Sequence, residues 1–265
     1  MEYDYLNRFD GRALPRDMRA FARLEIARPI VRQLQAEGLT VELVNGLAPL
    51  YEANRNDPTR KRIVHHYDMA LHPHRDPNDT VTLAVRYGEE LVACAAGIAA
   101  WVETDLASEL RALEHFYEDP KRMAKSGDCC IVTAPTASQI KHCTIAWSVG
   151  FWTAETHSRP NSILPAGTIR LLHLWLLAHW RFSYLVGMGR EPIARRYAIK
   201  LDGVATCELG LWIPRNAPLK DRERWFFVGA RDYLRWNFLR SEAADLSRPL
   251  GQPSEPNVVS EAKAA

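Results

Sequence analysis

The sequence predicts a mixed α/β fold, in which a central and mostly antiparallel sheet is flanked by helices. Three observations predict it. Residues 80–103 read as two strands joined by a glycine turn, further strand patterns follow along the chain, and helical patterns separate them without the regular alternation of βαβ units. We expect one domain over residues 1–246, with a helical N-terminal region at about 16–71, followed by a disordered tail at 247–265 that lacks aromatic residues.

The composition indicates a globular protein in which positive and negative charges are nearly equal in number. Of the 265 residues, 47% are hydrophobic and 25% are charged, and the net charge is +2, which gives no support for charge-driven binding of nucleic acid. The five cysteines are odd in number and show no C-x-x-C spacing, so we expect neither a disulfide framework nor a zinc site. The apolar run at 171–180 is too short for a membrane span, and we expect a reduced, cytoplasmic protein.

The first half of the chain supplies the N-terminal helices and a strand. Residues 16–38 have apolar side chains at helical spacing and end at Gly38, with Pro29 expected to kink or divide the helix. Residues 39–44 alternate as a strand does, and residues 45–71 look mostly helical.

The hairpin is the clearest local pattern. Its first strand alternates with period two, and its second strand is rich in alanine and glycine, which predicts close packing against it. Residues 105–120 are expected to form one amphipathic helix that ends at a proline. Residues 142–155 predict a long strand interrupted at Gly150 by a bulge or a close backbone approach.

The second half alternates between strands and helices. A loop at 158–167 precedes a strongly apolar helix at 168–182, which packs inside the domain or forms a homodimer interface. The stretch "FSYLVGMGREPIARRYAIKLDG" (182–203) predicts a buried strand, a turn at Gly187–Gly189 and a short basic helix. The remaining predicted elements are strands at 205–213 and 224–230 and a final helix at 231–246.

Three quoted pieces within residues 80–213 resemble the GNAT superfamily of acyl-CoA-dependent N-acyltransferases. The hairpin "LAVRYGEELVACAAGIAAW" resembles the family's second and third strands. The stretch "IAWSVGFWTAETHSRPNSILPAGTIRLLHLWLLAHW" resembles its fourth strand, cofactor loop and following helix. The stretch "YLVGMGREPIARRYAIKLDG" resembles its closing strand and helix, with Ala194 and Tyr197 ahead of a glycine.

The resemblance implies transfer of an acyl group from acetyl-CoA or a longer acyl-CoA to an amine or amino-acid-like acceptor, without a metal. A helix N-terminus suits the pyrophosphate, and a bulged strand offers backbone groups to the pantetheine arm. Transfer needs a base for the amine and an acid for the thiolate. The implied catalytic residues are Tyr197 as acid, with Glu155 and His157 (and more weakly Glu103) as base. The implied cofactor-binding residues are Ser148, Gly150, Trp152, Arg159, Asn161, Ser162 and Gly167.

One departure from the family pattern keeps a second interpretation open. The cofactor loop reads "HSRPNSILPAG", in which the expected glycines are replaced by Pro160, Asn161 and Ser162. Proline removes an N–H donor, and side chains crowd an approaching phosphate. The alternative to an enzyme is therefore a catalytically inactive domain of this fold that binds an acyl ligand or another protein.

Other motifs favour structural roles. Gly187 and Gly189 lack the third glycine of a dinucleotide-binding loop, so that interpretation is rejected. The histidines of "HPHRD" (72–76) lie in a proline-broken segment, where a structural or surface role is favoured over a metal site. His173 and His179 are expected to be hydrogen-bonded core or interface residues. Four tryptophans are expected to fill a core or line an acyl tunnel, namely Trp147, Trp152, Trp175 and Trp180.

Overall fold

The structure is a computed structural model of the whole chain. It describes residues 2–3, 18–56, 68, 71–72, 74–157, 162–189, 206–212, 223–231 and 234. The helices are α2 (Met18–Ala36), α3 (Ala48–Asn56), α4 (Leu106–Arg111), α5 (Pro120–Lys125) and α6 (Ile163–His179), with short 3-10 helices η2 (Pro77–Asp79), η3 (Pro135–Gln139) and η4 (Glu155–His157).

Nine strands in the described part of the chain form one sheet. They are β1 (Glu2–Tyr3), β2 (Leu39–Asn45), β3 (Thr80–Tyr87), β4 (Glu90–Val102), β5 (Ile131–Val132), β6 (Cys143–Thr153), β7 (Tyr184–Gly189), β8 (Thr206–Trp212) and β9 (Glu223–Ala230). Their order across the sheet is β1-β2-β3-β4-β6-β7-β9-β8-β5. Every neighbouring pair is antiparallel except β6 and β7, which are parallel. The predicted mixed, mostly antiparallel sheet is confirmed.

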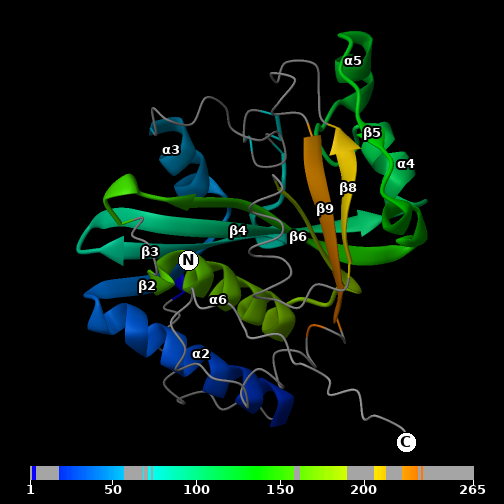
Figure 1. Cartoon of the computed structure of the whole chain (residues 1–265). Coiled ribbons are helices and arrows are strands. Elements are labelled where there is room, and N and C mark those ends of the chain that lie inside the picture. The colour runs from blue at the N-terminus through cyan, green and yellow to red at the C-terminus, as the bar shows by residue number, and fades with distance from the viewer. Residues whose placement is uncertain are drawn as a thin grey trace, which may run out of the picture.

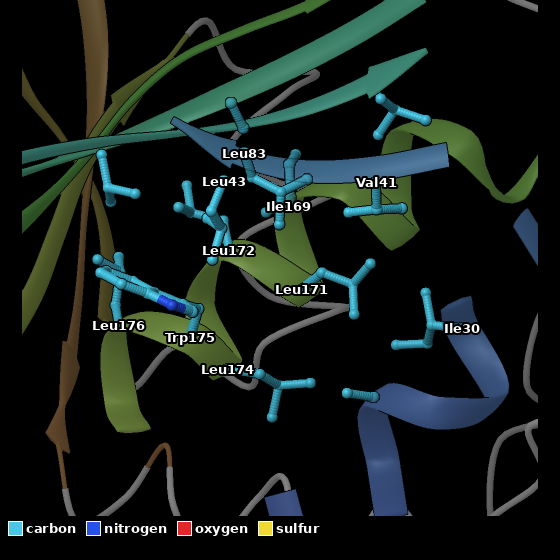
Figure 2. Close-up of a cluster of buried hydrophobic side chains, with 14 of the residues drawn as sticks. Ile30, Val41, Leu43, Leu83, Ile169, Leu171, Leu172, Leu174, Trp175 and Leu176 are labelled. Carbon is cyan, nitrogen blue, oxygen red and sulfur yellow. The ribbon is translucent and has the colours of Figure 1, made fainter. Parts of the chain in front are cut away.

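Helices cover the two faces of the sheet and enclose two hydrophobic cores. Helices α2 and α6 lie on one face, and α3 lies on the other (Figure 1). Figure 2 shows leucines of α6 directed toward Leu43 and Leu83 of the strands, with Ile30 of α2 alongside. Twelve of the seventeen residues of α6 are buried. Burial inside the domain therefore explains the apolar sequence of α6. The homodimer stays a prediction.

Most predicted elements in the described part of the chain form, and the differences there have local causes; the helices predicted within 190–203 and at 231–246 lie wholly or largely outside the described residues. The helix expected at 105–120 stops after Arg111, because Leu113 adopts a left-handed backbone with a φ of 68°. A second short helix, α5, then follows. Helix α2 runs through Pro29 without dividing. Helix α6 starts earlier than predicted, because Ser162 caps it by accepting a hydrogen bond from the Leu164 N–H.

Two glycines mark close packing on the sheet. A Cβ at Gly97 would lie 2.8 Å from Leu176 of α6, which confirms the predicted close approach to the second hairpin strand. Gly187 was predicted in a turn, but it lies inside β7, where a Cβ would come within 2.1 Å of the Phe227 ring. The absence of a side chain therefore makes room for a neighbouring ring at this position.

We expect Gly187→Ala to lower the free energy of unfolding by about 1–3 kcal/mol, because the new methyl group displaces the Phe227 ring. The same substitution in a Phe227→Leu background should cost less, because the ring is gone. Urea denaturation of the four proteins measures the coupling. An equal cost in both backgrounds would show that Phe227 is not the reason for this glycine.

Candidate functional site

Strand β6 carries a bulge at the position that the sequence predicts. Its pairing with β4 runs from Ala95 opposite Phe151 to Ala96 opposite Val149, so Gly150 has no partner on β4. Gly150 has a φ of 48°, in the left-handed region that favours glycine. The predicted interruption at Gly150 is confirmed as a bulge.

Strands β6 and β7 separate just before this bulge. Their parallel pairing covers Ile145–Ser148 and Tyr184–Gly187 and then ends. Beyond this point β6 continues to Thr153 along β4, and β7 continues to Gly189 along β9. A V-shaped opening therefore begins after the Ser148–Gly187 pair, and we call it the strand opening.

The backbone of β6 presents polar groups to the strand opening. The Ala154 N–H donates to the Val92 carbonyl of β4 at 2.8 Å. Backbone groups of successive residues in an antiparallel pair point to alternate edges, so Thr153 and Phe151 direct theirs away from β4 and toward the opening. An extended ligand with amide groups can add to such an edge as a strand does.

A cavity of about 430 Å³ lies on the face of β4 and β6 opposite α6. Its floor is formed by residues 98–100 of β4 and by Trp147 of β6. Trp147 precedes Val149 by two residues, so the cavity and the strand opening lie roughly 7 Å apart along β6, at the usual rise of a strand. They are close enough to form one site.

Histidine, arginine and acidic side chains surround the apolar floor of this cavity. Those that line it are His72, His74, Arg75, Asp76, Asp79, Glu114 and Glu118. Four carboxylates therefore face one guanidinium. Burial lowers the pKa of Arg75 to about 10, against the opposing effects of Glu118 and Asp79. Burial raises the pKa of the Asp79 carboxyl, and Asp76 adds to this effect. The excess of negative charge suits a ligand that carries an amine.

A buried chain of hydrogen bonds holds one wall of the cavity. One oxygen of Glu109 accepts the backbone N–H groups of Glu103 and Thr104 at 2.6 and 2.8 Å. The other lies 2.9 Å from His115 Nε2, and His115 Nδ1 accepts the Trp147 indole N–H at 3.3 Å. An indole can only donate, so Nδ1 is unprotonated and Nε2 carries the proton toward Glu109. Both nitrogens of His115 are therefore engaged.

The pKa of Glu109 reflects this environment. Burial raises the pKa of this carboxyl, but hydrogen bonds from His115 and from the Thr104 and Glu103 backbone outweigh burial and leave the pKa below its ordinary value. The carboxylate is thus held in its charged form. Its role is to fix the position of His115 and, through it, Trp147 on the cavity floor.

The structure places some of the predicted site residues together and separates others. Ser148, Gly150 and Trp152 lie on β6 at the strand opening. Glu155 and His157 lie in η4 beyond the end of β6, with His157 5.7 Å from the Tyr87 ring, and neither lines the cavity. Three predicted residues lie outside the described part of the chain, namely Tyr197, Arg159 and Asn161.

The start of α6 offers few donors to a phosphate. The Leu164 N–H donates to Ser162 Oγ at 3.1 Å, and the next residue, Pro165, has no N–H. Gly167 lies in the second turn, buried against Ile30 of α2, where its N–H belongs to the helix ladder. The pyrophosphate of a CoA donor therefore fits this helix end poorly.

Sequence reasoning missed the residues around the cavity. The segment "HPHRD" was assigned a structural or surface role, but His72, His74, Arg75 and Asp76 line the cavity. In the described residues no group of three or more histidine, cysteine or acidic side chains is arranged to hold a metal. None of the described helices is long and apolar enough to cross a membrane.

No family model and no curated protein matches the sequence. The structure is similar to FeeM, an N-acyl amino acid synthase from uncultured soil microbes, at 14% identity over 78% of this chain and 98% of that chain, with a TM-score of 0.45. It is also similar to Arabidopsis thaliana NAA60 in complex with acetyl-CoA, at 13% identity over 72% and 98% of the two chains, with a TM-score of 0.42.

A third similar structure is the aminoglycoside N(6')acetyltransferase of Legionella pneumophila, at 7% identity over 76% of this chain and 96% of that chain, with a TM-score of 0.37. The mixed, mostly antiparallel sheet with one parallel pair is the α/β fold that the sequence predicts. At these TM-scores the likeness carries no argument about the site, which rests on the geometry of this chain.

We expect Glu109→Gln to lower the free energy of unfolding at pH 7 by about 1.5–3 kcal/mol, because charged hydrogen bonds become neutral in a buried position. A carboxyl with a lowered pKa stabilises the fold above its ordinary pKa of 4.5, and this contribution is lost as the pH falls through the folded value. The difference between variant and wild type should therefore shrink in acid.

Urea denaturation between pH 7 and pH 3 measures this difference. Glu89→Gln is the matched control, because Glu89 is exposed in the β3–β4 turn, and it should change stability by less than about 0.5 kcal/mol. A difference for Glu109→Gln that does not depend on pH would contradict the charged state assigned to this carboxyl.

Proposed function

We propose that the protein is an N-acyltransferase that moves an acyl group from a thioester to an amine. The observation that carries the proposal is the strand opening beside a cavity, at the bulge of β6. A thioester with an amide-containing arm has an edge of β6 to pair with, and the acceptor amine has a cavity two residues away along the same strand. The two reactants are thus brought to one place.

The donor is an acyl thioester whose arm lies along residues Ser148–Trp152. Acetyl-CoA or a longer acyl-CoA is the expected donor from the sequence. Because the start of α6 has few free donors, the thioester arm provides most of the binding and the nucleotide end provides little. Arg159, Asn161 and Ser162 are the residues proposed to contact that end.

The acceptor is a cationic amine in the cavity. Its apolar portion lies on Trp147 and Ile98, and its ammonium group faces the surrounding carboxylates. The amine must lose a proton before it attacks. Asp79 has a raised pKa, which makes it a better proton acceptor than an ordinary carboxylate. Glu155 and His157 stay proposals for the same step at the far end of β6, and Tyr197 is proposed as the acid for the leaving thiolate.

A second candidate function is binding of an acyl ligand without transfer. The observation that favours it is again the start of α6, where Pro165 and the Ser162 cap remove donors that a nucleotide phosphate would use. Transfer of the acyl group to any amine distinguishes the two functions.

We expect Ala100→Phe to fill the cavity and raise the KM for the amine at least about tenfold, equivalent to about 1.4 kcal/mol, with little change in thioester affinity. Isothermal titration with acetyl-CoA and octanoyl-CoA measures donor binding, and a panel of amines measures transfer. The donor affinity of the variant is the internal control for folding.

Substitution of Gly150 at the bulge tests the binding of the thioester donor. Gly150→Val forces a β-branched residue into a left-handed backbone and should weaken thioester binding at least about tenfold. Arg159→Ala tests the predicted nucleotide contact. Binding of neither thioester by the wild type would refute the proposed function, and binding without transfer to any amine would favour the second candidate.

A further inference from the structure

A buried histidine on the wall of the cavity lies between a carboxylate and the tryptophan of the cavity floor. His115 Nε2 is 2.9 Å from Glu109 Oε2, and His115 Nδ1 accepts the Trp147 indole N–H at 3.3 Å. All three residues are buried, with Trp147 only 1% exposed, and both His115 and Trp147 line the cavity. The two rings meet edge to face, with their centroids 5.7 Å apart. The floor of the acceptor cavity is therefore an indole whose N–H is bound to an imidazole.

The protonation state of His115 decides whether this hydrogen bond can exist. In the neutral ring Nε2 already carries the proton that is directed to Glu109, so a second proton can be added only at Nδ1. Nδ1 is the nitrogen that faces Trp147. In the imidazolium both nitrogens are donors, and the Nδ1–H and the indole N–H then point at each other. The contact with Glu109 survives protonation, whereas the hydrogen bond from Trp147 does not.

Protonation of His115 acts on an amine in the cavity in two ways. A buried indole N–H that loses its acceptor is unfavourable, so the two rings must turn apart, and the floor beneath the amine changes shape. The new positive charge also lies on the wall of the cavity that receives the ammonium group, and like charges repel. Both effects weaken binding of the amine. The neutral ring is thus the form of His115 that supports the floor.

We propose that His115 is a positioning residue for the acceptor, which holds Trp147 in place when neutral and releases it when protonated. The inference rests on the proposed function, because it concerns the affinity of the same cavity for the amine. His115 thereby makes the KM for the amine depend on pH. The thioester arm pairs with residues 150–153 and is not affected.

Other titratable groups line the same cavity and have to be separated from His115. The segment before β3 contributes His72, His74, Arg75, Asp76 and Asp79. The segment that carries His115 contributes Glu114, Tyr117 and Glu118. Histidines as a class change charge between pH 5 and 8, so His72 and His74 could produce a similar pH dependence. A test must therefore keep all of these groups and change the imidazole of His115 alone.

Two amide side chains divide the functions of the two ring nitrogens. The oxygen of asparagine reaches the position of Nδ1, so His115→Asn keeps an acceptor for the Trp147 indole and does not titrate. The longer glutamine reaches the position of Nε2, so His115→Gln keeps a donor for Glu109 and offers no acceptor to Trp147. Both variants lose the ring, and a purely structural role would make them equally harmful.

We expect the two variants to differ in their KM for the amine. At pH 8, His115→Asn should stay within about threefold of wild type, whereas His115→Gln should raise the KM by about tenfold or more, because the buried indole N–H has lost its acceptor. The affinity for acetyl-CoA or octanoyl-CoA, measured by isothermal titration, should be the same in all three proteins. This donor affinity is the control for folding.

The pH dependence of the KM gives a second readout. The KM for the amine is measured between pH 5 and pH 8, and the ratio of wild type to His115→Asn cancels the ionisation of the amine and of the other cavity groups. We expect this ratio to rise by about tenfold or more as the pH falls. His142→Asn removes an exposed histidine that does not line the cavity, and it should keep the wild-type profile.

Nuclear magnetic resonance tests the hydrogen bond without any substrate. The indole N–H signals of the nitrogen-15-labelled full chain are recorded between pH 8 and pH 5, and Trp147→Phe identifies the signal of Trp147. We expect this signal to move with pH in wild type and in His142→Asn, and to stay fixed in His115→Asn. Its midpoint should coincide with the midpoint of the KM ratio.

The outcomes separate this inference from the proposed function. A Trp147 signal that follows His115, together with a higher KM for His115→Gln than for His115→Asn, supports the inference. A signal that does not change with pH, or that still moves in His115→Asn, refutes the inference and leaves the proposed transfer to an amine intact. Equal KM values for the two variants also refute it. Absence of transfer to any amine by the wild type overturns the proposed function, and the inference with it.

Discussion

The site depends on the different partners that β6 keeps on its two edges. Along β4 it stays paired from Cys143 to Thr153, whereas along β7 it pairs only as far as Ser148. If β6 and β7 stayed paired along their whole length, their backbone groups would bond to each other. No free edge would then remain for a ligand. The bulge at Gly150 changes the local twist of β6 just past the last pair. The free edge of residues 150–153 results from this separation.

Two cores on opposite faces keep the separation in place. On one face, α6 packs between α2 and the strands, with Leu176 fitted over Gly97. On the other, Glu109 anchors His115 and Trp147 beneath the α4 segment. The first core is apolar and depends on shape, whereas the second contains a buried charge and depends on satisfied hydrogen bonds. The strand opening is therefore held from both sides by packing that does not itself contact a ligand.

Local pattern predicted most of the sheet and little of the site. Alternation along β3 and the glycine in β6 depend on neighbours in the chain, so the hairpin and the bulge could be predicted. Leu113 gave no such signal, because a left-handed leucine is fixed by the packing of its buried side chain and not by its propensity. The role of Gly187 was misread for a similar reason, since the Phe227 ring comes from a strand forty residues away.

The hydrogen bond between Ser148 and His173 shows the same limit. Ser148 and His173 are 25 positions apart on two different elements, β6 and α6. No helical or strand periodicity in the sequence brings them together. A polar pair in this location is not what packing alone would favour, because the residues around His173 on α6 are leucines and a tryptophan. An apolar side chain at 173 would fill the core without any need for a hydrogen-bond partner. The hydrogen bond to Ser148 offsets part of the cost of burying this imidazole, and no pattern within either element predicts that the two residues meet.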